Sequence, residues 1–332
     1  MPKAISREAK VSTQPFISVV VLNWNGKRFI DPFMKSFLQQ TYPKDRIELL
    51  FTDNGSSDDS VAYLNEHYGS DKRIKVVLNG KNYGYAGGND LGIKEAKGDF
   101  ILITNNDLEL DKDAIKELVA TAKRRNADIT TAKLMYLNRP GYINNAGSEL
   151  RPNSDWPIRE IGIDEKDHGQ YNEERELTAV CGACILIRRD FLETVGMFDK
   201  TFFLYFEDGD LSWRGQHAGK HYWFSPKAVA LHFHTGSTKE GSPTFNHFVG
   251  RNRILILAKN ASFQVMAKGF AKTIRDQFFF RVKNAWASLF HRYSRRLAWE
   301  EFWRSQKIIW SIICLLPYAY AKRWGIIKEE TL

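Results

Sequence analysis

Few cysteines and no membrane-spanning apolar run occur in this sequence. Its 332 residues include only three cysteines, at positions 181, 184 and 314, which excludes a disulfide framework. Cys181-Gly-Ala-Cys184 lacks the second CxxC or nearby histidine of a zinc site. We interpret it as small residues packing in a strand, with redox chemistry as the alternative, in a reducing compartment. Residues 308–320 are almost wholly apolar, but a spanning helix needs about 20 such residues, so an interfacial or re-entrant segment is favoured.

Three further signals are absent. Residues 1–15 carry charge without an apolar core, so we expect no secretory signal there and interpret them as a flexible arm. The phosphate-binding motif GxxxxGK[ST] does not occur. The glycine-rich run 82–92 follows the third expected strand instead of the first, and its glycines lack GxGxxG spacing. These absences argue against P-loop and dinucleotide-binding enzymes.

Positive charge is concentrated at the end of the chain. The formal net charge is +9, and residues 261–332 hold thirteen Lys and Arg against five Asp and Glu. Nucleic acid and anionic membrane are both candidate partners for such a segment. Phe and Trp interleaved with the basic residues, beside the short apolar run, favour the membrane and argue against nucleic acid.

Apolar runs alternate with amphipathic stretches, which predicts βαβ units and a mostly parallel sheet in an α/β fold. We divide the chain into the arm 1–15, a catalytic domain 16–260 and a basic, aromatic-rich helical region 261–332. Residues 136–175 are predicted to be a long loop. The expected strands are 17–23, 47–52, 74–78, 100–104, 178–187 and 228–232. The expected helices are 29–40, 61–68, 90–96, 113–125, 189–195 and 211–217.

Polar residues follow the expected strands, at the sheet edge where open parallel sheets bind ligands. Leu22-Asn23-Trp24 ends the first strand and either turns the chain or forms a wall for a nucleobase. Asp53 ends the second strand, where a carboxylate can accept from a pyrimidine N3–H or from ribose hydroxyls. The neighbouring residues, by contrast, are ordinary helix caps.

The third and fourth strands end on residues suited to phosphate and metal. The run from Gly84 to Asn89 can place backbone amides close to a nucleotide-sugar. Asn105-Asn106-Asp107 offers the oxygen ligands that Mg²⁺ or Mn²⁺ prefers, although a polar turn is the alternative.

Acidic residues and histidines form two later clusters. In Glu207-Asp208-Gly209-Asp210, one of the first two acids is a candidate general base. Asp210 has a structural alternative, because acids are favoured at helix starts and Arg214 can pair with it. His232 and His234 share one face of the last strand and are candidate ligands of a metal or a diphosphate.

In this order and spacing, the motifs resemble those of family 2 glycosyltransferases with the GT-A fold, in particular rhamnosyltransferase-like members. The resemblance covers about residues 17–260. The motifs are Val19-Val20-Val21-Leu22-Asn23-Trp24-Asn25, Asp53-Asn54-Gly55-Ser56-Ser57-Asp58, Asn82-x-Gly84-Tyr85-Ala86-Gly87-Gly88-Asn89-x-x-Gly92, Asn105-Asn106-Asp107, Glu207-Asp208-x-Asp210-Leu211-x-x-Arg214 and His232-x-x-x-Gly236-Ser237.

The resemblance implies a donor linked to dTDP or UDP, a divalent metal (Mg or Mn) and inversion at the anomeric carbon. Asp107 corresponds to the last residue of the family's DxD metal motif, with Asn105 in place of the first Asp, and His232 to the histidine near metal and diphosphate. Asp208 corresponds to the general base and Asp53 to the base-contacting aspartate. The expected donor-binding set is Leu22, Asn23, Trp24, Asp53, Gly84, Asn89 and Asn106, and the expected acceptor or supporting set is Glu207, Asp210, Arg214 and His234. Arg251-Asn252-Arg253 also resembles a family segment, without an assigned role.

The expected activity is transfer of a sugar, with rhamnose one candidate, to a hydroxyl of a cell-surface glycan or lipid-linked acceptor. We expect the protein at the cytoplasmic face of the membrane, with a homodimer through the C-terminal helices as a further possibility. One alternative is a sugar nucleotidyltransferase, which would need a basic glycine-rich loop after the first strand. The other is a non-catalytic module that binds membrane or nucleic acid.

Overall fold

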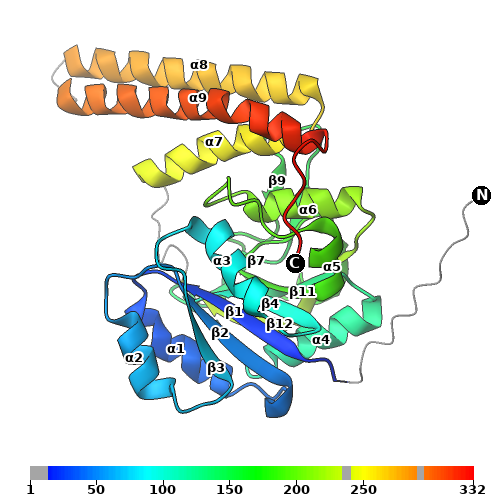
Figure 1. Cartoon of the computed structure of the whole chain (residues 1–332). Helices are drawn as coiled ribbons and strands as arrows, with labels where there is room; N and C mark the ends of the chain where they lie inside the picture. Colours follow the sequence, from blue (N-terminus) through cyan, green and yellow to red (C-terminus); the bar gives the residue numbers. More distant parts are fainter. Residues whose placement is uncertain (1–13, 234–240, 290–294) are drawn as a thin grey trace, which may run out of the picture.

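The computed structural model describes residues 14–233, 241–289 and 295–332, without the side chains of 280–289, 295–299 and 301. A mixed sheet forms its centre, in the order β10-β12-β6-β11-β4-β1-β2-β3, with β5 paired to β12 and β7 to β6 (Figure 1). A separate hairpin joins β8 and β9. The strands are β1 (Ile17–Asn23), β2 (Ile47–Asp53), β3 (Ile74–Leu78), β4 (Phe100–Asn105), β5 (Leu108–Leu110), β6 (Ile129–Tyr136), β7 (Ile143–Asn145), β8 (Ser148–Leu150), β9 (Ile158–Glu160), β10 (Arg175–Leu177), β11 (Cys184–Arg188) and β12 (Tyr222–His232).

Helices cover both faces of the sheet. Successive strand residues point to opposite faces, so Val19 and Val21 of β1 enter one apolar core and Val20 enters the other. The first core lies under α1 (Lys27–Leu38), α2 (Ser60–Tyr68) and α4 (Ala114–Arg125). The second lies under α3 (Gly84–Glu95), α5 (Arg189–Val195) and α6 (Glu207–His217). A short 3-10 helix, η1 (Lys44–Arg46), leads into β2.

Strand pairing brings the polar strand ends together. β3, β2, β1 and β4 are mutually parallel neighbours, and their register places Asn23 beside Asp53 and Leu22 beside Asn105. β11 joins this half to the parallel pair β6 and β12 through antiparallel pairing. This architecture confirms the α/β prediction and aligns the three strand ends named above at one edge of the sheet.

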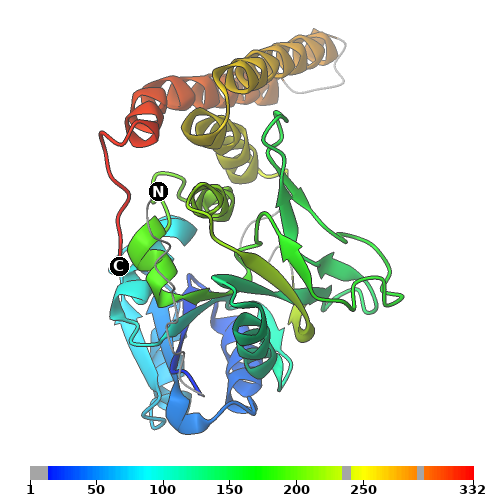
Figure 2. The same cartoon turned by 90° about the vertical axis from the view of Figure 1, so that its right-hand side faces the viewer.

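Three C-terminal helices form a layer on top of the sheet domain (Figures 1 and 2). They are α7 (Pro243–Asn260), α8 (Phe263–Leu289) and α9 (Arg295–Arg323). The Ser242 hydroxyl caps α7 by accepting from Phe245 N at 3.2 Å, and Pro243 occupies the favourable first position. A third apolar core joins α7 to Ile308 and Ile312 of α9 and to Trp213 of α6. In the part of the chain described, no helix has both the length and the apolar content needed to cross a bilayer.

The chain end returns to the sheet domain after α9, as the red trace in Figure 1 shows. The Glu330 carbonyl accepts from Met197 N at 2.8 Å, and Leu332 N donates to the Leu192 carbonyl at 3.4 Å. The last residues of the chain therefore contact the sheet domain directly, whereas α9 packs on α7.

Several predicted boundaries were wrong. The helix expected over 90–96 already begins at Gly84, as α3, and α6 begins at Glu207 rather than residue 211. The expected loop 136–175 contains β7, β8 and β9, and it follows a strand, β6, that was missed. β11 begins at Cys184 rather than residue 178, and β12 begins at Tyr222 rather than 228. β7, β8 and β9 have three residues each, so they present too few residues for an alternating pattern to be recognised.

Candidate active site

The side chain of Asn23 links the ends of β1, β2 and β4. Its Nδ2 donates to Asp53 Oδ1 and to Ser56 Oγ, both at 3.1 Å, and its Oδ1 accepts from Asn106 Nδ2 at 2.9 Å. A Cβ at Gly26 would lie 2.3 Å from Asn106 Nδ2, so a larger residue there would displace the hydrogen bond between Asn23 and Asn106. Asn23 and Asn106 are buried, so we assign these two donor-site candidates to shaping the strand edge rather than to free ligand contacts.

Asp53 is held by the turn that follows it. Its carboxylate also accepts from Ser56 N at 2.9 Å and from Ser56 Oγ at 2.6 Å, and the residue is only 5% exposed. Trp24, by contrast, projects from the strand end and is exposed, and Leu22 packs against Gly88. Trp24 is therefore accessible to a ligand at this edge, whereas Asp53 is buried.

The first amides of α3 are occupied by protein. Tyr85 N and Ala86 N donate to the Phe203 carbonyl at 2.6 and 3.3 Å. Gly84 has φ +73°, and a Cβ there would lie 2.2 Å from that carbonyl oxygen. The expectation that these amides are available to a nucleotide is therefore corrected, and Gly84 serves close packing. Asn89 is buried, and its Oδ1 has no hydrogen-bond partner among the described residues.

Asp107 and His232 form the proposed metal-binding pair. His232 Nε2 lies 3.3 Å from Asp107 Oδ1, and both side chains are about nine-tenths buried. His232 Nδ1 donates to Asn144 Oδ1 at 2.8 Å, which orients the ring so that Nε2 faces the Asp107 carboxylate. Imidazole nitrogen and carboxylate oxygen are both metal-ligand atoms. His234 lies outside the described residues.

This donor set fits part of a divalent-cation shell. No group of three or more His, Cys, Asp or Glu that could hold a metal occurs in the described part of the chain. However, Mg²⁺ and Mn²⁺ sites commonly use one or two protein ligands together with substrate phosphates and waters. Asn105, two residues before Asp107, has a buried Oδ1 without a hydrogen-bond partner among the described residues. Its oxygen is a further candidate ligand.

Asp208 and Glu207 lie in the first turn of α6, where the helix dipole favours acids. Asp208 Oδ2 accepts from Gly182 N at 2.8 Å, and Oδ1 accepts from Gly209 N at 2.7 Å. Burial raises the pKa of the Asp208 carboxyl, while the two backbone N–H groups oppose that rise. Burial and the Asp208 charge raise the pKa of Glu207 well above its ordinary value, and Glu207 Oε2 lacks a partner within the described chain.

Of this acidic pair, Asp208 is the one better suited to ionise. Two N–H donors stabilise its carboxylate, and its side chain is only partly buried. Neighbouring carboxyls whose pKa values are driven apart by their surroundings are a common arrangement in acid–base sites. The Tyr85 hydroxyl donates to the Gly182 carbonyl at 2.7 Å and so supports the turn before β11, whose Gly182 N contacts Asp208. Sequence reasoning missed Tyr85 and Gly182, because their contribution depends on a backbone contact.

Asp210 and Arg214 hold α6 in place instead of facing a ligand. Arg214 Nε donates to Asp210 Oδ2 at 2.9 Å, which confirms the expected pair, and Asp210 is fully buried. Lys259 Nζ of α7 also contacts Asp210 Oδ2, at 2.9 Å. Arg214 donates further to the carbonyls of Val195 and Met197. We therefore assign both residues to structural support rather than to acceptor contact.

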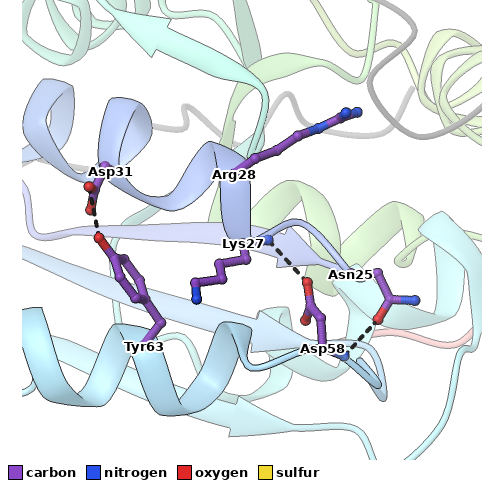
Figure 3. A pocket seen from close by; sticks show the side chains of 6 residues that line it. All are labelled: Asn25, Lys27, Arg28, Asp31, Asp58 and Tyr63. Carbon is purple, nitrogen blue, oxygen red and sulfur yellow. Dashed lines mark hydrogen bonds between the residues drawn. The ribbon is translucent and has the colours of Figure 1, made fainter.

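A cavity of about 660 Å³ lies beside the end of β1 (Figure 3). It is lined by Asn25, Lys27, Arg28, Asp31, Asp58 and Tyr63. Lys27 N donates to Asp58 Oδ2 at 3.3 Å, and the Tyr63 hydroxyl donates to Asp31 at 2.9 Å. Figure 3 shows the Arg28 side chain directed away from the other five. The cavity places two cations close to the strand edge, which sequence reasoning also missed. Neither Asp107 nor Asp208 lines it.

Solved structures of glycosyltransferases share this fold. GalNAc-T7 with UDP, GalNAc and Mn²⁺ matches with a TM-score of 0.58 and 16% identity, over 75% of this chain and 51% of that one. The mannosyltransferase PcManGT of Pyrobaculum calidifontis, with GDP-Man and Mn²⁺, matches at 0.55 and 14%, over 92% and 88%. TarS residues 1–349 of S. aureus match at 0.53 and 20%, over 93% and 88%. At these identities the likeness shows the GT-A fold alone, and it confirms the predicted fold class.

Curated relatives match over part of their length. The low-salt glycan biosynthesis hexosyltransferase Agl10 of Haloferax volcanii is 28% identical over 174 residues, which are 51% of this chain and 53% of the relative. The poly(ribitol-phosphate) beta-glucosyltransferase of Bacillus spizizenii is 30% identical over 141 residues, which are 42% and 22%. The chain thus spans about half or less of the length of these relatives. The family model described as "Glycosyl transferase family 2" matches residues 18–196, and the chain belongs to this family of glycosyltransferases.

Proposed function

We propose that this protein moves a sugar from a nucleoside diphosphate to a hydroxyl of a cell-surface glycan or lipid-linked acceptor, with inversion at the anomeric carbon. The observation that carries the proposal is that two groups of different chemistry are present, a single carboxylate and a carboxylate–histidine pair. Asp208, with two N–H donors, is suited to take a proton. The Asp107–His232 pair is suited to a divalent cation beside a diphosphate.

In the proposed reaction, the Asp208 carboxylate takes the proton of an acceptor hydroxyl. The hydroxyl oxygen attacks the anomeric carbon from the face opposite the nucleotide, and the bond from that carbon to the diphosphate oxygen breaks in the same displacement. The proton ends on Asp208. One carboxylate is sufficient for this step, whereas a glycosidase places carboxyls on both sides of the bond.

Asp107 and His232 would hold Mg²⁺ or Mn²⁺, which when bound supplies positive charge beside the leaving diphosphate. The Asn144 contact fixes the His232 ring so that Nε2 faces Asp107. Trp24 and the Asp53 turn would border the nucleoside. Two of the neighbouring solved structures hold Mn²⁺, one with UDP and one with GDP-Man, which supports a nucleoside-diphosphate donor.

A donor screen tests the proposal. Thermal protection and donor hydrolysis would be measured with dTDP-, UDP- and GDP-linked sugars plus Mn²⁺, and dTDP-rhamnose belongs in the panel because of the rhamnosyltransferase-like motifs. We expect protection by one nucleotide class, retained by the free nucleoside diphosphate. If no nucleotide-sugar protects or is consumed, the proposed activity is wrong.

We further propose that α9 binds the cytoplasmic face of an anionic membrane. Trp303 and Trp310 of α9 are 50% and 62% exposed and lie seven residues apart, which places them on one side of the helix, and Trp324, 69% exposed, directly follows the helix. The opposite side, with Ile308 and Ile312, is buried against α7. Tryptophan is favoured at membrane interfaces, and the net positive charge of region 261–332 complements anionic headgroups.

Vesicle flotation tests this surface with the full chain. Trp303→Gln should weaken binding to vesicles that contain anionic lipid, whereas Trp156→Gln, which removes a tryptophan of similar exposure (47% against 50%) outside α9, should not. The competing occupant is a second copy of the chain, through the same stripe. A wild-type protein that is dimeric by light scattering and fails to float at low salt would favour that dimer and overturn the membrane proposal.

A further inference from the structure

The loop that leads into α6 has an unusual backbone. Phe203, Tyr205 and Phe206 have φ of 64°, 69° and 69°. This left-handed region is unfavourable for residues with a Cβ, and for bulky side chains above all. Three such residues within four positions persist only if their surroundings fix them, and backbone strain of this kind gathers at functional sites.

The constraint comes from Asn252 of α7. The two N–H groups of its Nδ2 are shared among three carbonyls of the loop, those of Phe202, Leu204 and Tyr205, each with an N···O distance of 2.8 Å. Asn252 is fully buried, and its Oδ1 accepts from Arg251 Nε at 2.8 Å. Arg251 Nη2 adds bonds to the carbonyls of Thr201 and Phe202, each at 2.8 Å. One amide group therefore binds most of the loop.

The loop in turn supports the candidate base from two directions. Phe206 is the N-cap residue of α6 and directly precedes Glu207 and Asp208. On the other side, the Phe203 carbonyl accepts from Tyr85 N, and the Tyr85 hydroxyl bonds the Gly182 carbonyl. Gly182 N then donates to Asp208 Oδ2. These contacts connect the loop through α3 and Gly182 to Asp208, in the first turn of α6.

We infer that Asn252 is a positioning residue, which fixes the Asp208 carboxylate by holding the strained loop 202–206. The inference rests on the proposed role of Asp208 as general base. Without the three amide bonds, the loop relaxes towards negative φ, and the start of α6 turns away from Gly182. A small displacement of a catalytic group is costly, because a shift of about 1 Å can lower a rate by about 100-fold.

Asn252→Asp is the variant that tests this role. Aspartate keeps the shape and the acceptor for Arg251 but removes the N–H donors. We expect kcat to fall by about 10–100-fold, while the dissociation constant of the nucleoside diphosphate changes less than twofold. Adding Tyr205→Gly should restore part of kcat, because glycine adopts positive φ without strain. Equal losses in kcat and in nucleotide affinity, or no loss of kcat, would overturn the inference.

A double-mutant cycle with Asp208→Asn distinguishes the positioning role of Asn252 from the proposed role of Asp208 as general base. If Asn252 acts through Asp208, then Asn252→Asp causes little further loss in the Asp208→Asn background. A full additional loss there would contradict the positioning role. Normal turnover of Asp208→Asn alone would instead refute the proposed base. If Asn252→Asp does not fold, Arg251→Lys is the second test, because it loses the bonds to the Thr201 and Phe202 carbonyls. We expect this variant to have a lower kcat and an unchanged nucleotide affinity. An unaltered kcat would count against the inference.

Discussion

Replacing Asp199 by asparagine should destabilise the fold in a pH-dependent way. Asp199 Oδ2 accepts from Lys259 Nζ at 2.7 Å, and Oδ1 accepts from the Tyr318 hydroxyl at 3.1 Å and from Thr201 N at 3.0 Å. Its side chain is 1% exposed. Burial opposes ionisation, but the charge and hydrogen bond of Lys259 outweigh it and lower the pKa of Asp199 to about 2.

The lowered pKa sets the size of the effect. A carboxyl whose pKa falls from 3.8 unfolded to about 2 folded contributes about 2 kcal/mol of stability at neutral pH. Because the folded pKa is the lower one, this contribution is fully present above about pH 4 and is lost as the pH falls towards 2. The amide of Asp199→Asn cannot ionise, so the variant lacks the contribution at every pH.

Urea unfolding at pH 7, 5 and 3 measures this difference. We expect Asp199→Asn to be less stable than wild type by about 2 kcal/mol at pH 7 and 5, with a smaller gap at pH 3. Asp59→Asn, which removes an exposed partner of Lys27, should show no measurable change. A gap of constant size across this range would refute the argument, because the loss would then come from packing rather than from charge.

Three other predictions follow from the site and the chain end. EDTA should weaken nucleoside diphosphate binding measured by calorimetry, and Asp107→Ala should bind as weakly with Mn²⁺ as without it; equal wild-type affinity in both conditions would exclude the metal. Asp53→Ala should weaken binding of the free nucleoside diphosphate, because the turn at the end of β2 loses its acceptor, and an unchanged affinity would remove Asp53 from the site. Glu329→Gln should lower the melting temperature by a few degrees, since Glu329 pairs with the buried Lys259 at 3.2 Å. The matched variant Glu330→Gln, at a more exposed carboxylate, should shift it less, and equal shifts would contradict the role of the buried charge.

The half of the fold formed by β1, β2, β3 and β4 could be predicted from the sequence, because its strands are apolar runs separated by amphipathic helices. Residues 17–23 were predicted as a strand and form β1 with the same bounds. The starts of α3 and α6 could not be predicted. α3 opens on Gly84, whose positive φ is set by contact with Phe203, and α6 opens after three left-handed residues. Both depend on tertiary contacts between segments that are distant in the sequence.

For the candidate site, the sequence suggested candidate residues but not the contacts that orient them. Strand-end position and family resemblance predicted Asp107, His232 and Asp208. They could not predict that Asn144 orients His232 or that Gly182 contacts Asp208, since these contacts join residues that lie many positions apart. Nor could they assign Asn252, because its partners are backbone carbonyls, which every residue possesses. The basic C-terminal region was interpreted from its charge, whereas the structure shows that its apolar side also packs on the sheet domain through α7.

The central claim is that Asp208 is the general base of a glycosyl transfer, and Asp208→Asn tests it most directly. The amide keeps the shape of the carboxylate but cannot take the acceptor proton. Transfer would be followed by release of nucleoside diphosphate, and donor binding by calorimetry with Mn²⁺. We predict that turnover falls by about 10²–10⁴-fold while donor affinity stays close to wild type. Wild-type turnover in this variant, or a selective loss of activity in Glu207→Gln instead, would contradict the account.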